Sequence, residues 1–226
     1  MLQVLSTLDP RTAAVLERLY VESDSRPEPV PPKDLAEYPR PVELTEEQVR
    51  AFDDEFLTLE KEQAAYCYTQ ARATGARTIV EFGTSFGIST IWLAAAVRDN
   101  GGGTVISAER VPRKAERARA HIAEAGLEQY VEIRVGDARE TLRALDGPVD
   151  MFLNDGFPDV ALEVHRLVTP ALRPGALVIT DNVGLMPDLY ADYLAWIRDP
   201  AHGFVSVRIP FHGGTEFSVL TEAVPA

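Results

Sequence analysis

The chain has 226 residues, of which 46% are hydrophobic and 25% charged, so it can bury the core of one large α/β domain. Its formal net charge of −13 opposes binding to the phosphate backbone of nucleic acids and to anionic membrane surfaces, and we expect neither partner. The single cysteine, Cys67, excludes an internal disulfide. No secretory signal and no membrane-spanning run is visible, which predicts a cytoplasmic protein.

The N-terminal part is predicted to be a helical arm. Apolar residues between positions 4 and 22 fall on one stripe, which Pro10 can divide, and a proline-rich connector covers 26–32. A long helix is then expected from a cap at Thr45 to about Thr74, as two helices or one bent helix. We therefore divide the chain into an arm over 1–44 and a domain over 45–226. We leave a homodimer open.

From position 76 the pattern alternates between strands and helices. This alternation predicts an α/β fold with a doubly wound, mostly parallel sheet that ends in an antiparallel hairpin. Strands are expected at 78–82, 104–108, 131–135, 149–153 and 176–180, followed by the hairpin strands 204–209 and 216–220. Helices are expected at about 88–98, 112–125, 139–145, between 154 and 168, and at 187–198.

Two carboxylates and an amide follow two of the predicted strands. Asp155 comes after the apolar run 149–154, and Asp181 and Asn182 come after 176–180. Because ligands bind outside the carboxyl ends of the strands in such sheets, these side chains should converge. Hard oxygen ligands suit Mg²⁺, Mn²⁺ or Ca²⁺. The alternative is that both aspartates cap the following turns, with no metal.

A glycine turn follows the first predicted strand, with glycines at Gly83 and Gly87. A dinucleotide fingerprint would need two further glycines, where the chain has Ser85 and Ile88, so the turn suits a cofactor without a pyrophosphate. Glu109, at the end of the second strand, can accept both ribose hydroxyls, and Asp137, at the end of the third, can accept from an adenine amine. A solvated strand end and a helix cap are the respective alternatives.

The chain resembles the class I S-adenosylmethionine-dependent O-methyltransferases. The residues that carry the resemblance are the stretch from Val80 to Thr90, Glu109, Gly136-Asp137-Ala138, Asp155 and Asp181-Asn182. It is similar in particular to the metal-dependent catechol and caffeoyl-CoA branch. The resemblance implies a seven-stranded Rossmann-like methyltransferase fold that binds S-adenosylmethionine and Mg²⁺ or a similar cation. It places Glu81, Gly83 and Ser89 around the methionine part, Glu109 at the ribose, and Asp137 and Ala138 at the adenine. Further cofactor contacts are expected from Thr84, Ser85, Gly87, Arg110 and Asp155, and the metal ligands would be Asp155, Asp181 and Asn182.

One position departs from the resemblance. Members of that branch usually carry a lysine base three positions after the first metal aspartate, where this chain has Pro158. We consider His212 and Glu216 as catalytic substitutes near the acceptor hydroxyl. The alternatives are an ordinary loop histidine and an edge-strand charge that discourages aggregation. His165 is expected on a helix surface.

These observations favour methyl transfer to a hydroxyl of a small, aromatic acceptor with the help of a divalent cation. The acceptor pocket is expected to draw on Phe157, Met186, Trp196 and Phe211. One alternative is a non-catalytic or metal-independent S-adenosylmethionine-binding protein, which Pro158 supports. A less favoured alternative is an NAD-dependent oxidoreductase, which lacks both the glycines and a Tyr-x-x-x-Lys pair.

Overall fold

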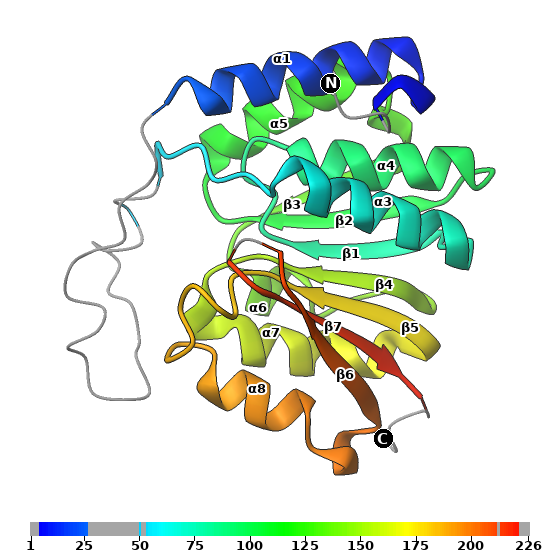
Figure 1. Cartoon of the computed structure of the whole chain (residues 1–226). Coiled ribbons are helices and arrows are strands. Elements are labelled where there is room, and N and C mark those ends of the chain that lie inside the picture. Colours follow the sequence, from blue (N-terminus) through cyan, green and yellow to red (C-terminus); the bar gives the residue numbers. More distant parts are fainter. Residues whose placement is uncertain (1–4, 27–49, 51–52, 212, 222–226) are drawn as a thin grey trace.

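The computed structural model describes residues 5–26, 50, 53–211 and 213–221. In this part of the chain a seven-stranded sheet has the order β3-β2-β1-β4-β5-β7-β6, with helices on both of its faces (Figure 1). Only β7 runs against its neighbours, since it pairs antiparallel with both β5 and β6. The predicted doubly wound sheet with a terminal antiparallel hairpin is therefore confirmed. The strands are β1 (Thr78–Phe82), β2 (Thr104–Glu109), β3 (Val131–Val135), β4 (Val149–Asn154), β5 (Leu172–Thr180), β6 (Phe204–Ile209) and β7 (Thr215–Leu220).

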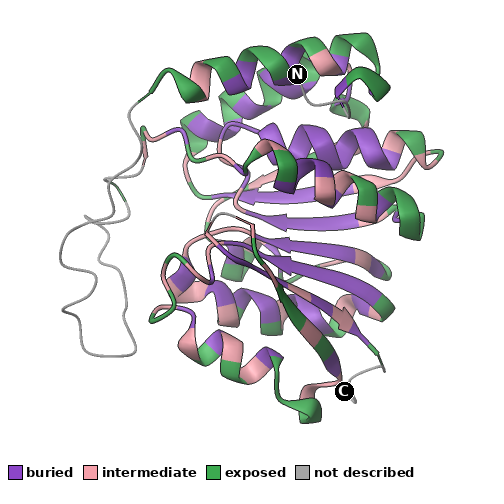
Figure 2. Cartoon of the chain, viewed as in Figure 1, coloured by how far each residue is buried: buried purple, intermediate pink, exposed green. Residues whose placement is uncertain are grey.

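Two cores fill the space between the sheet and its helices, and the central strands β1, β2, β4 and β5 are largely buried (Figure 2). Alternate residues of a strand point to opposite faces, so Ile79 enters one core and Val80 the other. One face carries α3 (Lys61–Thr74), α4 (Ile88–Asp99) and α5 (Pro112–Glu124), with α1 (Pro10–Asp24) outside them. The other carries α6 (Ala138–Thr141), α7 (Ala161–Val168) and α8 (Ala191–Ile197). Short 3-10 helices lie at Leu5–Thr7, Glu128–Tyr130, Pro158–Val160, Thr169–Ala171 and Pro200–His202.

The N-terminal helix begins where the sequence can start one. Asp9 accepts hydrogen bonds from the backbone amides of Arg11 and Thr12, and Pro10 occupies the first helical turn, where its missing N–H costs nothing. Pro10 therefore begins α1 and separates it from the short 3-10 helix before it. The proline-rich connector, the cap at Thr45 and the boundary between 44 and 45 lie outside the described residues.

The predicted helix from 45 to 74 is not continuous in its described part, since Arg50 is helical but the chain leaves the helix before residue 55. Residues 55–60 are not helical, and α3 begins only at Lys61. The reason is packing, because Phe56 and Leu59 are buried and the Phe56 ring stacks on Phe86 of the glycine turn at 4.5 Å. The segment before α3 thus covers that turn.

Three other elements differ in length from their predictions. Strand β5 begins at Leu172 and continues through Pro174 and Gly175, which are exposed, so the missing proline N–H is tolerated. Helix α6 ends at Thr141. Helix α8 begins at Ala191 because the residues after β5 form turns. None of the described helices has the length and apolar character needed to cross a membrane.

Candidate active site

Backbone hydrogen bonds hold the ends of the central strands in one row. The amide of Gly83 donates to Ala108 O at 3.1 Å, that of Asp155 to Phe82 O at 2.9 Å, and that of Asp181 to Asn154 O at 3.3 Å. The residues that follow β1, β4 and β5 therefore lie side by side, as the sequence predicts. This row is the C-terminal rim of the parallel strands, where such sheets bind ligands.

The turn after β1 requires glycine for two reasons. Gly83 has φ of +106°, and a Cβ there would lie 2.3 Å from the carbonyl oxygen of Asp155. Gly87, which precedes α4, has φ of +90° and would crowd Ala118. Ser85 adopts the left-handed region at +49°, which is strained for a side-chain-bearing residue. Backbone held this way is common at ligand sites.

Glu81 lies fully buried beneath the turn with one carboxylate oxygen occupied and one vacant. Its Oε2 accepts from Thr90 and Ser107 hydroxyls at 2.5 Å each, whereas Oε1 has no hydrogen-bond partner among the described residues. Burial raises the pKa of this carboxyl despite those hydrogen bonds and that of Ser89. A buried, unpaired carboxylate oxygen favours a donor or a cation from a ligand.

Glu109, at the end of β2, turns toward the same loop. Its Oε2 accepts from the amide of Ser85 at 2.7 Å and its Oε1 from that of Val111 at 2.9 Å. Burial raises the pKa of the Glu109 carboxyl, and these amides and the charge of Lys114 oppose the rise. The position next to the turn is the one that the sequence predicts. Thr84, within the turn, is buried and hydrogen-bonded to Ser107 at 2.5 Å.

Asp137 has a structural task as well as its predicted place near the rim. It caps α6 by accepting from the amide of Arg139 at 2.9 Å and pairs with the Arg139 guanidinium at 2.7 Å, which lowers the pKa of its carboxyl. Ala138 beside it is buried, and Arg110 is exposed. The capping alternative for Asp137 is therefore what the structure shows, and an adenine contact remains a prediction.

Asp155 and Asp181 form a pair of carboxylates that repel each other. Burial raises the pKa of each carboxyl, and that of Asp155 rises further through the charges of Asp181 and Glu81. The pKa of Cys67, on α3, and that of Tyr190, before α8, are raised by burial and then by both aspartates. Asp181 is buried and Asp155 half-buried, so the two acids share a region with little access to solvent, which favours a cation.

Two neighbours fix the ligands at the end of β5. Gln63 of α3 donates from Nε2 to Asp181 Oδ1 at 2.6 Å and to the Thr215 hydroxyl at 2.9 Å. Asn182 has φ of +62°, and its Oδ1 would lie 3.1 Å from a Cβ on Gly213. No cluster of three or more His, Cys, Asp or Glu able to hold a metal occurs among the described residues. The predicted ligand set of Asp155, Asp181 and Asn182, two carboxylates and an amide, therefore remains a prediction.

The predicted catalytic acid Glu216 faces away from this site. It accepts from Arg198 Nε at 2.7 Å and Nη2 at 2.6 Å, and from the Ser206 hydroxyl at 2.5 Å. Its neighbour Thr215 points to Gln63 and Asp181, so Glu216 points to the opposite face. This arrangement does not support a catalytic role for Glu216. His212 lies outside the described residues.

The predictions for His165 and Trp196 need correction, whereas Pro158 still marks a position without a base. His165 is fully buried rather than on the surface, among the rings of Phe152, Tyr193, Trp196 and Phe204. Trp196 therefore packs under the sheet instead of lining an acceptor pocket. Pro158 is buried at the start of a 3-10 helix, so no base stands at that position.

The sequence alone did not reveal three neighbours of the two aspartates, which are Gln63, Cys67 and Tyr190. Gln63 and Cys67 lie on one turn of a helix and could be read only as core positions. The contact between Gln63 and Asp181 joins residues 118 positions apart. No local pattern carries information of that kind.

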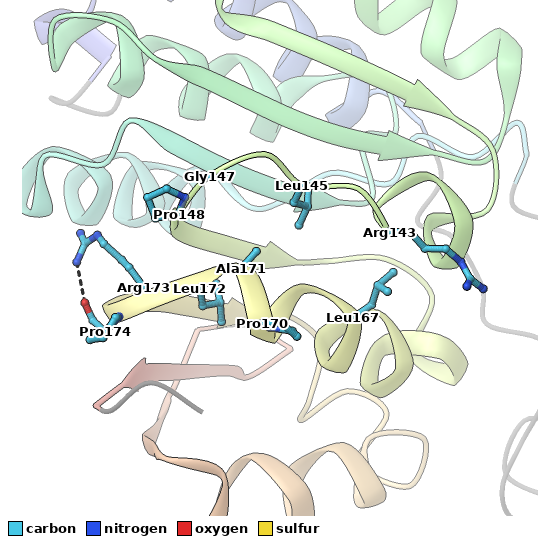
Figure 3. Close-up of a pocket in the computed structure, with 10 residues that line it drawn as sticks. All are labelled: Arg143, Leu145, Gly147, Pro148, Leu167, Pro170, Ala171, Leu172, Arg173 and Pro174. Atoms are coloured by element: carbon cyan, nitrogen blue, oxygen red, sulfur yellow. Dashed lines mark hydrogen bonds between the residues drawn. The ribbon is translucent and has the colours of Figure 1, made fainter. Parts of the chain in front are cut away.

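Two hollows of the described surface differ in their distance from the rim. One of about 530 Å³ opens near the starts of β4 and β5, at the end of the sheet opposite the rim, and Figure 3 shows its lining, which includes Arg143 and Arg173. The other, of about 440 Å³, lies at the rim beside the loop that follows Asn182. Only the second adjoins the candidate site.

Comparison with known proteins agrees with this geometry. Residues 80–183 match the model of a family described as a methyltransferase domain. Catechol O-methyltransferases of Niastella koreensis and Mycobacterium tuberculosis are each 34% identical to the chain, over 131 and 128 residues, which is 56% of this chain in both cases. The aligned region spans 58% and 57% of those proteins.

A solved structure extends the likeness over most of the chain. The O-methyltransferase TomG from Streptomyces achromogenes, involved in tomaymycin synthesis and solved in complex with SAM, is 28% identical. It superposes with a TM-score of 0.64, covering 90% of this chain and 95% of its own. The sheet order and the glycine turn define a Rossmann-like methyltransferase fold. The chain is similar in sequence and fold to S-adenosylmethionine-dependent O-methyltransferases.

Proposed function

We propose that this protein transfers a methyl group from S-adenosylmethionine to a hydroxyl of a small aromatic acceptor, assisted by Mg²⁺ or a similar cation. The observation that carries the proposal is the contact between two strand ends. Gly83 of the turn lies so close to Asp155 that a Cβ would approach its carbonyl oxygen to 2.3 Å. A cofactor on the turn and a group held by Asp155 would therefore share one cleft. The catechol O-methyltransferase relatives support the reaction type.

The vacant oxygen of Glu81 supports the cofactor half of the proposal. A buried carboxylate oxygen without a partner suits the ammonium of a methionine moiety. Glu109, fixed by two backbone amides, still has lone pairs for ribose hydroxyls. The tight approach at Gly83 packs the turn against the backbone of Asp155 and brings the two strand ends together.

The residues at the ends of β4 and β5 fit a hard divalent cation. Asp155 and Asp181 are desolvated and repel each other, and Asn182 adds a neutral oxygen. These three residues would hold the ion. A divalent cation there, when bound, favours the ionised form of an acceptor hydroxyl and holds two adjacent oxygens in place.

Methyl transfer from a sulfonium needs in-line alignment and a deprotonated oxygen, because the departing thioether is neutral. The chain supplies alignment through two rigid features, the strained glycine turn and the fixed end of β5. The described residues place no lysine or histidine beside Asp155, and Pro158 cannot accept a proton. The proton of the acceptor hydroxyl must therefore leave to solvent or to a group outside the described residues. His212 remains a prediction for that role.

Pro158 also supports a second candidate, a protein that binds S-adenosylmethionine without catalysing transfer. A positioned base is typically worth about 10²–10⁴-fold in rate, so its absence can leave a cofactor-binding protein with little activity. Calorimetric titration with S-adenosylmethionine and with NADH, each with and without Mg²⁺, separates the candidates. We expect S-adenosylmethionine to bind and NADH not to bind. Tight NADH binding would overturn the proposal.

A further inference from the structure

The hollow of about 440 Å³ at the rim has the size of a small-molecule pocket. Its lining joins two loops, the one after β5 and the one between β6 and β7. The walls combine apolar side chains with bare backbone and a single charged group. They are formed by Gly184, Leu185, Arg208, Pro210, Phe211, Gly213 and Gly214.

The charged group is Arg208, whose guanidinium lies against glycine backbone. A Cβ on Gly184 would lie 1.8 Å from Nη2 of Arg208, and a Cβ on Gly214 would lie 2.6 Å from the same atom. Gly184 is not among the glycines with a positive φ, so its backbone does not require glycine. The missing side chain instead leaves room for the guanidinium of Arg208. The two glycines therefore make the notch in which the guanidinium rests.

Within the described part of the chain, Arg208 has no ion pair and no hydrogen bond to its side chain. Its cross-strand partner Glu216 is the nearest acid in register, but both Glu216 oxygens are bound by Arg198. An exposed, unpaired guanidinium at the edge of a hollow, in a chain with a net charge of −13, is available to an anionic ligand.

The hollow adjoins the candidate metal ligands. Gly213 lines it and also approaches Asn182, whose Oδ1 would lie 3.1 Å from a Cβ there. The amide of Gly184 donates to Gly213 O at 2.7 Å, which locks the two loops together. The ring of Phe211 packs against that of Tyr66, with the two ring centroids 5.4 Å apart. Tyr66 lies one turn after Gln63 on α3. The hollow and the proposed reaction site thus share a wall.

We propose that Arg208 binds a carboxylate of the methyl acceptor, so that the acceptor is a hydroxylated aromatic acid. This inference rests on the proposed function. A planar guanidinium binds a carboxylate through two parallel hydrogen bonds, and Leu185 and Phe211 provide apolar surface for the ring. With the carboxylate at Arg208, the ring would lie in the hollow, whose wall at Gly213 adjoins Asn182.

The test compares two acceptors that differ only in the carboxylate, 3,4-dihydroxybenzoate and catechol, in methyl transfer with Mg²⁺. We expect Arg208→Ala and Arg208→Gln to raise KM for 3,4-dihydroxybenzoate by about tenfold or more, with kcat retained, because a charge-assisted contact is lost. KM for catechol should not change. The matched control is Arg143→Ala, an exposed arginine at the opposite end of the sheet (Figure 3), which should leave both KM values unchanged.

Calorimetric binding of 3,4-dihydroxybenzoate to the protein loaded with S-adenosylhomocysteine tests the subsite without turnover. Weaker binding to both Arg208 variants, but not to Arg143→Ala, is the expected result. Equal affinity of wild type and the Arg208 variants would overturn the inference, as would equal losses for both acceptors. If neither acceptor is methylated by wild type yet the affinity difference is present, the proposed function fails while the carboxylate subsite stands.

Discussion

The side-chain amide of Gln63 donates to Oδ1 of Asp181 at 2.6 Å and so ties α3 to the end of β5. Gln63 is fully buried, and within the part of the chain that the structure describes its own Oε1 has no hydrogen-bond partner. The helix that covers the rim is therefore fastened to a candidate metal ligand by a single side chain.

Gln63→Leu keeps the size of the side chain but removes both hydrogen bonds. We expect the free energy of unfolding to fall by about 1–3 kcal/mol, since Asp181 loses its shortest donor in a buried place. Urea denaturation measures the change. Gln70→Leu, half-buried on the same helix, is the control, and equal stability of the two variants would contradict the role of Gln63.

The close approach at Gly83 makes a second prediction. Gly83→Ala introduces both a left-handed backbone strain and a contact of 2.3 Å with Asp155 O, so it should destabilise the fold by about 2 kcal/mol or more. It should also weaken binding of S-adenosylmethionine. Gly101→Ala shares a positive φ of +90° but meets nothing within 4 Å. If Gly83→Ala and Gly101→Ala bind S-adenosylmethionine with equal affinity, the turn does not contribute to cofactor binding.

The sequence predicts the rim well because strand ends are encoded locally. The apolar runs before Asp155 and Asp181 end where the strands end, and the parallel topology then brings the two residues together. The start of α3 is not encoded in this way. Phe56 and Leu59 have helical spacing, but both are buried in an extended segment because Phe56 stacks on Phe86. That stacking is a long-range contact, which local propensity cannot reveal.

The orientation of Glu216 is a second feature that local sequence does not reveal, this time in a strand. The hairpin and its approximate position follow from the glycines between β6 and β7. The face to which Glu216 points depends on register, and a shift of one residue exchanges Thr215 and Glu216. Thr215 faces Asp181, while Glu216 pairs with Arg198. Both residues are buried, so polarity in the sequence does not distinguish the two faces.

His165 predicts a pH dependence of stability. Burial lowers the pKa of His165 to about 3 from an ordinary value of 6.5. The folded protein therefore keeps this group neutral while the unfolded chain takes up a proton below pH 6.5, so stability falls as the pH decreases. Between pH 7 and pH 5 the loss from this group is about 2 kcal/mol.

His165→Gln cannot titrate and should lose less stability than wild type over that interval. The raised pKa values of Asp155, Asp181 and Glu81 act in the opposite direction, but both proteins share them. Denaturant unfolding at pH 7 and at pH 5 gives the difference. Identical pH slopes in the two proteins would show that His165 is not held neutral by the fold.

Asp181→Ala tests the metal role apart from the cofactor. We expect loss of metal-dependent turnover and of Mn²⁺ binding, with the Kd for S-adenosylmethionine changed by less than about threefold. The exposed Asp192→Ala on α8 is the matched control and should retain both properties. Turnover that survives in Asp181→Ala would rule out the metal role.

The central claim is that the glycine turn and the carboxylate pair serve one reaction in one cleft. Methyl transfer from S-adenosylmethionine to catechol, measured before chelation, after chelation and after restoring Mg²⁺, tests it most directly. We predict a methylated product that disappears with the chelator and returns with the ion. Product formation that is unaffected by the chelator, or its absence from catechols and phenols alike, would contradict the claim.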